Sequence, residues 1–243
     1  MDTLTMNSPA LSAATPSRPR ARALGALLIA DALLAFAPVV VLGAAIGWPA
    51  SLDRPPAEQL AAIAAAPDAV ALGYGLYLLY SVLVAPLMIG LAARLHGGGL
   101  AHPLAATVAA FGVLSALARS VGILRWLTVM PELAQAHATA DAATRSQIEL
   151  AFATTTAYGG GIGELLGVSL FMAFAVGLLG AAAWRQRSLP RPLAGAAVAV
   201  ALVLGSLFLP ALRIDATAPM AVAVSALSLW MLATGAWLMR RAR

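Results

Sequence analysis

The chain contains no cysteine among its 243 residues. That absence excludes disulfides, thiolate nucleophiles, iron–sulfur clusters and cysteine-ligated zinc. Lysine is absent too, since all 15 basic residues are arginine, which excludes a Walker A lysine and a lysine Schiff base. Charged residues make up only 10% and hydrophobic residues 61%, whereas soluble domains have about 25% and about 45–50%. The composition therefore excludes an ordinary water-soluble protein.

Six apolar stretches are each long enough to cross a bilayer, which takes roughly 20 mostly apolar residues. They cover residues 23–48, 69–93, 104–130, 160–184, 193–212 and 220–239. The first is longer than the apolar region of a signal peptide, so we expect a retained helix. Internal prolines such as Pro38, Pro86 and Pro210 predict kinks. The sequence predicts an all-α polytopic transmembrane helical bundle of six spans over residues 22–243, after a disordered tail over residues 1–21.

The arginines indicate how these spans are oriented. Ten arginines lie in segments on the side of both termini, three lie on the opposite side and two lie within the third span. Cytoplasmic loops carry such an excess of positive charge, so we expect both termini to be cytoplasmic. The net charge of +5 then reflects topology and not nucleic-acid binding. Together with the alanine-rich, lysine-free composition, this predicts a multi-pass protein of a bacterial cytoplasmic membrane, with the lipid bilayer as its main partner.

Four charged residues lie inside predicted spans: Asp31, Arg119, Arg125 and Glu164. A charge at mid-bilayer costs about 2.5–3.5 kcal/mol on insertion scales, so each must be paired, neutralised or hydrated. Counting from the span ends puts Arg125 and Glu164 at similar outer depth, with Arg119 about 9 Å deeper but able to extend outward. We therefore expect an Arg–Glu cluster between the third and fourth spans, with bidentate geometry.

Asp31 has no partner that the sequence identifies, because its depth differs from that of Arg119 by about 10 Å. Hydrogen bonds from hydroxyl groups, or a neutral carboxyl group, are the alternatives. Tyr77 lies on the second span, where its hydroxyl either serves the Arg–Glu layer or lies at the membrane interface. The cluster as a whole is a structural lock between helices, a small-solute or transport site, or a catalytic site.

Glycines recur beside Glu164. Gly159, Gly163 and Gly167 are spaced by four residues and form a doubled GxxxG pattern, which presents a flat face for close helix packing. The run of three glycines at 159–161 also predicts a bent or partly unwound helix end. A discontinuous helix that lines a binding cavity is the alternative to simple packing.

Two segments on the side opposite the termini are longer than turns. Residues 49–68 include an alanine-rich stretch that predicts a short surface helix, and residues 131–157 predict a helix lying along the outer surface. Six acidic residues lie in these two segments and a seventh, Asp215, lies in the third outer connection, and together they form either a solvated face or a cation-attracting vestibule. The histidines His96, His102 and His137 lie outside the spans, and no HExxH or GxSxG motif is present. We therefore assign no metal site, no cofactor and no catalytic residue.

The middle of the chain resembles an uncharacterised bacterial six-helix membrane family, known only as a domain of unknown function. The resemblance is carried by Arg125-Trp126 followed by Pro131 and Leu133, and by the Gly-Ile-Gly-Glu-Leu-Leu-Gly run at residues 161–167. It covers residues 119–170 specifically and residues 20–240 in hydropathy and span count. The resemblance implies a multi-pass inner-membrane protein and supplies no activity.

Function is left open between classes. The first hypothesis is a non-enzymatic membrane protein whose Arg–Glu core orders an outward-facing cavity that binds or moves a small solute, or that acts with a membrane-protein partner or a second copy of itself. The alternatives are a transporter or transporter-accessory subunit, and a membrane-embedded enzyme that uses Glu164 on a lipid or lipid-linked substrate. An enzyme normally needs a second convergent group such as histidine, serine or a metal set, and the sequence places none at that depth.

Overall fold

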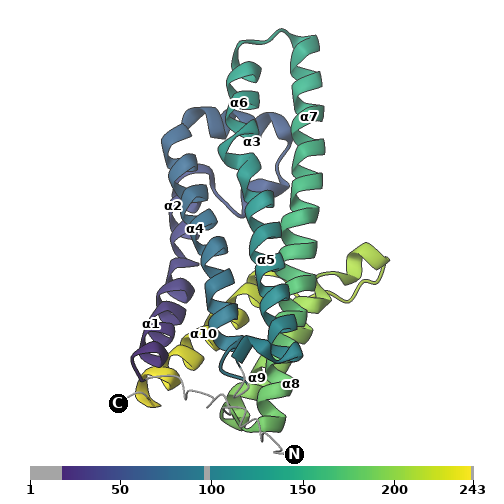
Figure 1. Cartoon of the computed structure of the whole chain (residues 1–243). Coiled ribbons are helices and arrows are strands. Elements are labelled where there is room, and N and C mark those ends of the chain that lie inside the picture. Colours follow the sequence, from purple (N-terminus) through teal and green to yellow (C-terminus); the bar gives the residue numbers. More distant parts are fainter. Residues whose placement is uncertain (1–17, 96–98, 242–243) are drawn as a thin grey trace, which may run out of the picture.

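The computed structural model describes residues 18–95 and 99–241, which form an elongated bundle of helices (Figure 1). Five helical segments are long and apolar enough to cross a membrane: α1–α2 (Arg18–Leu34 and Ala37–Ile46), α4 (Pro67–Ala92), α5–α6 (Pro103–Leu127 and Val129–Thr139), α7–η3–α8 (Ala142–Gly160, Gly161–Phe171 and Met172–Gln186) and α10 (Met220–Arg241). The sixth apolar segment is the shorter helix α9 (Arg191–Ser206). The predicted all-helical polytopic bundle is therefore confirmed.

Most of the described arginines lie at one end of the bundle, in short connections between helices and near the chain ends. We call it the arginine-rich end. Helix α1 begins there and α10 ends there, as do α4 and α8 (Figure 1). The predicted tail over residues 1–21 lies mostly outside the described residues. Residues 18–21 already belong to α1, because proline at position 19 is compatible with a first helical turn.

Neighbouring helices pack in pairs around an apolar core. Helix α4 packs on α5 and α2, α5 on η3, α8 on α9, and α1 on α10. Side chains that are almost completely buried fill the space between them, among them Leu28, Leu87, Met172, Leu179 and Leu204. This packing places α5 and η3 side by side, and these two elements carry Arg119, Arg125 and Glu164, three of the four charged residues expected inside spans.

Two predicted spans are interrupted. The first breaks between Leu34 and Ala37, because Pro38 has no N–H to donate to the preceding turn. The fifth ends at Ser206 and continues as the short 3₁₀ helix η4 (Leu209–Leu212), which contains Pro210. Helix α9 is 16 residues long, about 24 Å, and is therefore shorter than the hydrocarbon thickness of about 30 Å. In contrast, α4 continues through Pro86.

The prediction that residues 131–157 form a helix lying along the outer surface is wrong. Instead, α6 continues α5 and α7 continues into η3, so that α6 and α7 form a hairpin projecting beyond the bundle (Figure 1). Pro131 lies in the first turn of α6, where proline does not interrupt helical hydrogen bonds. The short 3₁₀ helix η1 (Ala50–Asp53) precedes the predicted surface helix, α3 (Pro56–Ala65), which packs on α6 and α7. Leu60, Met130 and Phe152 are buried in this second core.

Polar contacts close the tip of this hairpin. The Asp141 carboxylate accepts a hydrogen bond of 2.8 Å from the Thr144 amide and caps the start of α7. That bond holds the pKa of Asp141 below its usual value. The Nε2 atom of His137 on α6 lies 2.9 Å from the Oε1 atom of Glu149 on α7. The Nε–H group of Arg145 donates a hydrogen bond to the His137 carbonyl. The hairpin is therefore a defined structural element and not an extended loop.

Candidate functional site

The charged residues of α5 and η3 lie near one level of the bundle. A helix needs about 20 residues to cross the hydrocarbon layer. Tyr74 on α4, Arg125 on α5 and Glu164 on η3 each lie about 20 residues along their helices from the arginine-rich end. A hydrocarbon layer that begins at the arginine-rich end would therefore have its opposite boundary at this level. Charged groups there are reached by water more easily than at mid-bilayer.

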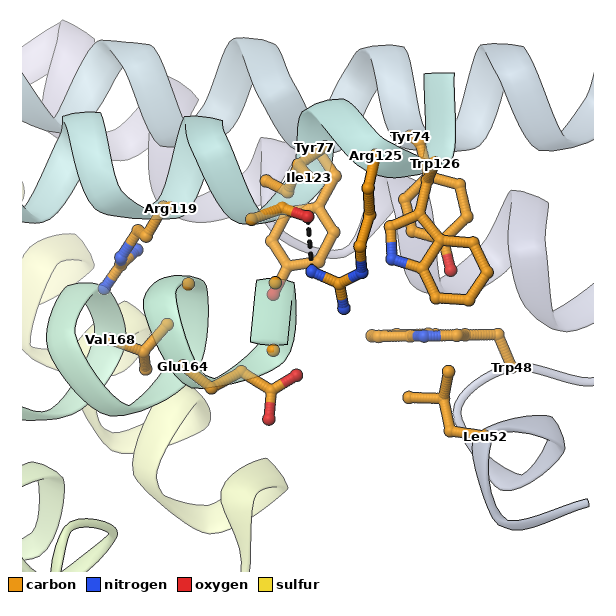
Figure 2. A pocket seen from close by; sticks show the side chains of 14 residues that line it. Trp48, Leu52, Tyr74, Tyr77, Arg119, Ile123, Arg125, Trp126, Glu164 and Val168 are labelled. Atoms are coloured by element: carbon orange, nitrogen blue, oxygen red, sulfur yellow. Dashed lines mark hydrogen bonds between the residues drawn. The ribbon is translucent and has the colours of Figure 1, made fainter. Parts of the chain in front are cut away.

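A small cavity opens at this level, and we call it the outer pocket (Figure 2). Its volume is about 50 Å³, room for roughly three or four water molecules. Its lining comes from α4, α5, α7, η3 and the connection after α2, and comprises Trp48, Leu52, Tyr74, Tyr77, Arg119, Gly122, Ile123, Arg125, Trp126, Gly159, Gly160, Gly163, Glu164 and Val168. Four of the five predicted polar residues therefore line one cavity, while Asp31 is not among its lining residues.

Arg125 is held in place by contacts with its own helix. One guanidinium nitrogen, Nη1, donates a hydrogen bond to the Gly122 carbonyl, and the guanidinium carbon lies 5.3 Å from the centroid of the Trp126 ring. The Nε–H group is buried and has no acceptor among the described residues. Arg125 therefore presents an unused donor in a fixed orientation.

Glu164 faces Arg125 from η3 without forming an ion pair with it. Figure 2 shows the two side chains directed into the same space from opposite helices. A Cβ atom added to Gly160 would lie 3.7 Å from Arg125 Nη2 and 3.9 Å from Glu164 Oε1, so these charged atoms are at most about 7.6 Å apart. An ion pair requires a nitrogen and an oxygen within 4.0 Å of each other. Among the described residues, His137 and Glu149 meet this limit, whereas Arg125 and Glu164 do not.

The expected bidentate contact is therefore not formed. Its physical reason is that the Gly122 carbonyl and the Trp126 ring fix the Arg125 guanidinium on the α5 side of the pocket. Glu164 is an exposed residue that lines the open cavity, so its carboxylate is accessible to a small molecule that enters the pocket. The two opposite charges leave a gap that a small polar molecule can enter.

Arg119 lies deeper and is almost completely buried, with 3% of its surface exposed. Its Nη1 donates a hydrogen bond of 3.2 Å to the Tyr80 hydroxyl, while Nε and Nη2 are buried without an acceptor among the described residues. Arg119 is also the charge that acts on Asp31, which is completely buried. Neither Asp31 oxygen accepts a hydrogen bond from a described residue.

Aromatic rings form the remaining walls. Tyr74 stacks on Trp126 with ring centroids 4.7 Å apart and planes within 3°. Trp48 meets Tyr77 edge-on at 6.1 Å. The Tyr74 hydroxyl is buried and has no partner among the described residues. The rings give the cavity rigid apolar walls, and its polar groups come from the two arginines, Glu164 and the tyrosine hydroxyls.

The three spaced glycines lie along the contact of η3 with α5. A Cβ on Gly163 would come within 3.2 Å of the Gly122 Cα, and a Cβ on Gly167 within 2.9 Å of the Arg119 amide nitrogen. A Cβ on Gly159 would come within 2.6 Å of the Arg125 side chain. Close packing of backbone on backbone therefore holds α5 and η3 together. The expected unwinding at residues 159–161 is replaced by a continuous helix whose residues 161–171 adopt π geometry, a rare form that occurs often at functional sites.

A comparison with protein-family models gives one match, to the domain of unknown function DUF4386, over residues 23–239. The chain belongs to the DUF4386 family. The matched range includes both segments that carry the resemblance, residues 125–133 and 161–167. No curated protein and no solved structure matches the chain.

In this DUF4386 protein, reasoning from the sequence missed several residues of the pocket. Trp48 and Leu52 come from the connection after α2, where no periodic pattern marks them. Tyr74 lies on the predicted second span three residues before Tyr77, where nothing in the sequence marks it as a pocket residue. Gly122 lies seven residues after Ser115 on the same face of α5, and the structure shows that Ser115 also contacts the glycine face, by donating to the Gly167 carbonyl.

Proposed function

We propose that this integral membrane protein binds a small carboxylate-bearing solute in the outer pocket, reached from the side opposite the arginine-rich end. In a bacterial cytoplasmic membrane with both termini inside, that side is the periplasmic or external one. The observation that carries the proposal is the pair Arg125 and Glu164, which face one cavity at a distance too long for an ion pair.

Unused hydrogen-bond donors support an oxyanion in the pocket. The Nε–H of Arg125, two N–H-bearing nitrogens of Arg119 and the Tyr74 hydroxyl are all buried without a partner among the described residues. A buried donor without an acceptor costs about 1–3 kcal/mol and more when it is charged. Carboxylate oxygens match the planar guanidinium group in geometry and charge. A bound carboxylate would satisfy several of these donors together.

Glu164 supports a solute that also carries a donor group. Its carboxylate lies across the pocket from Arg125, where it would repel a simple anion but accept a hydrogen bond from an ammonium or hydroxyl group on the same molecule. The cavity of about 50 Å³ limits the solute to a few non-hydrogen atoms, well below the roughly 300–1,000 Å³ of pockets for drug-sized ligands. Small amino acids and hydroxy acids fit this chemistry.

A cysteine placed at Gly160 tests the proposal directly. Its Cβ would lie in ordinary contact with both Arg125 and Glu164, and the chain has no other cysteine. We expect a small thiol reagent to label Gly160→Cys in the purified, reconstituted protein, and glycine or acetate to slow the labelling. Methylammonium should not protect. Glu164→Gln should weaken protection by glycine more than protection by acetate.

Two control variants separate the pocket from its surroundings. Gly161→Cys lies next to the reporter, but its Cβ meets nothing within 4 Å, so its labelling should not depend on the solutes. Arg125→Gln should remove protection, whereas Arg213→Gln, at an exposed arginine outside the pocket, should preserve it. Protection by methylammonium as strong as that by acetate, or no protection by either carboxylate, would contradict the proposal.

Movement of the solute through the bundle is a second candidate function, favoured by a buried polar path. Tyr80, Arg119 and Asp31 continue from the pocket into the bundle, with Asp31 completely buried. Buried ionisable groups within spans are typical of substrate and proton pathways. A lipid-modifying enzyme is favoured by no comparable observation, since the pocket lining includes Glu164 but no serine, threonine or histidine.

A further inference from the structure

A second cavity lies at the arginine-rich end, far from the outer pocket, and we call it the arginine pocket. It has a volume of about 380 Å³ and takes arginines from four elements: Arg18 at the start of α1, Arg94 after α4, Arg187 after α8 and Arg241 at the end of α10. An adjoining hollow shares Arg187 and Arg241 and adds Arg191. Among the described residues, none that lines either cavity is acidic.

No acidic residue among those that the structure describes balances the charge of this pocket. Nine of the ten acidic residues lie within a span or in the connections at the opposite end, and the tenth is at position 2, outside the described residues. Arg94 and Arg241 line the same cavity, and burial together with the positive charge of Arg241 lowers the pKa of Arg94. An anion bound between them would favour the charged form of Arg94.

Apart from Ser188, the rest of the lining is apolar. Leu189 and Trp237 are half-buried, whereas Leu91, Leu95, Leu179 and Leu238 form the buried floor. Trp237 lies against the Arg241 guanidinium at 5.3 Å. A tryptophan at this level is typical of a membrane–water interface. The pocket therefore combines a strongly positive mouth with apolar walls at the depth of lipid headgroups.

Two further features indicate that the mouth receives an oxyanion. The Ser188 hydroxyl lies at the pocket, buried and without a partner among the described residues. Arg187 adopts a left-handed backbone with φ of 55° at the end of α8, a position where glycine is the usual residue. An arginine at this position costs backbone energy, which a role for its guanidinium explains.

We propose that the arginine pocket binds the phosphate of an anionic phospholipid, with Ser188 donating to the same phosphate and the half-buried Leu189 and Trp237 contacting the apolar part of the lipid. The exposed parts of Leu189 and Trp237 favour a lipid over a free phosphate, because a soluble anion would leave them in contact with water. Basic pockets between helices on the cytoplasmic side of membrane proteins bind such headgroups.

The test measures lipid binding to the purified full-length protein in detergent, by native mass spectrometry and by thermal unfolding. Phosphatidylglycerol should bind more tightly than phosphatidylcholine and should raise the unfolding temperature, and each pocket arginine removed should weaken that binding about five-fold. The variants are Arg94→Gln and Arg187→Gly. The second is the sharper one, since glycine suits the left-handed backbone and the fold should be kept or stabilised while lipid binding falls.

Arg185→Gln and Arg240→Gln are matched controls, because they remove one charge at the same end but do not line the pocket. Both should bind phosphatidylglycerol as the parent does. Equal loss in the pocket variants and the controls would show a general basic surface and overturn the proposal. Displacement of phosphatidylglycerol by an equal concentration of inorganic phosphate or glycerol 3-phosphate would assign the site to a soluble phosphate and also overturn it.

Discussion

Two of the charged residues are more deeply buried than Arg125 and Glu164, and they define the energetics of the bundle interior. Asp31 is completely buried on α1 and Arg119 nearly so on α5. Arg119 donates to Tyr80, but the Asp31 oxygens and two Arg119 nitrogens have no partner among the described residues. No ion pair within 4.0 Å joins these two described residues, so the charge of Arg119 offsets only part of the desolvation cost of Asp31.

Removing one of these charges should leave the other uncompensated. We expect Asp31→Asn and Arg119→Met each to lower the free energy of unfolding in detergent by about 3–5 kcal/mol. The double variant should be less harmed than the sum of the two, by about 1–3 kcal/mol.

The pair Asp31→Asn and Arg125→Met is the control for this cycle. Arg119, and not Arg125, is the charge that acts on Asp31, so these two losses should add to within about 0.5 kcal/mol. A coupling of the same size in both pairs would mean that Asp31 responds to the general field of the bundle and not to Arg119.

At the scale of elements, the sequence patterns predicted where the helices lie along the chain better than they predicted the contacts between their side chains. Counting residues from span ends brought Arg125 and Glu164 to one level because helical rise is constant. The same count could not predict that the Gly122 carbonyl and the Trp126 ring hold Arg125 away from Glu164, because side-chain orientation depends on tertiary packing. Trp48 was missed for a related reason, since it reaches the pocket from an irregular connection.

The projecting hairpin shows where hydropathy alone misleads. Residues 131–157 are too polar for a span, so the sequence favoured a surface helix. The structure continues α5 and η3 outward instead, because α3 covers the apolar side of α6 and α7 and buries residues such as Phe152. Hydropathy identifies what lies in lipid, whereas the ends of helices depend on caps and on partners from distant segments.

The contact of α5 with η3 predicts that replacing a glycine by alanine destabilises the protein at one position and stabilises it at another. A Cβ on Gly122 would lie 2.7 Å from the Gly163 Cα, whereas a Cβ on Gly161 would meet nothing within 4 Å. Gly122→Ala should therefore destabilise the protein by about 1–3 kcal/mol through overpacking. Gly161→Ala should stabilise it by up to about 1 kcal/mol, because alanine favours helix. Thermal unfolding of the two variants measures both effects, and a stabilised Gly122→Ala would disprove the close contact.

The whole molecule has two chemically different ends. The outer pocket offers arginines opposed by Glu164 beside the projecting hairpin, and the arginine pocket offers positive charge without an acidic lining residue. This asymmetry follows from the distribution of charge along the chain, since the short connections at one end carry arginine and those at the other carry most of the acidic residues. The orientation in the membrane therefore decides which pocket meets the cytoplasm.

Single cysteines test that orientation, since the parent chain has none. Arg145 is exposed on the hairpin and Arg185 is exposed at the arginine-rich end. In intact cells, a membrane-impermeant maleimide should label Arg145→Cys, and should label Arg185→Cys only after the membrane is permeabilised, because the arginine excess favours a cytoplasmic location. A cysteine placed within residues 1–15 should behave as Arg185→Cys does. Labelling of either cytoplasmic position from outside would reverse the topology, and the outer pocket would then take its solute from the cytoplasm.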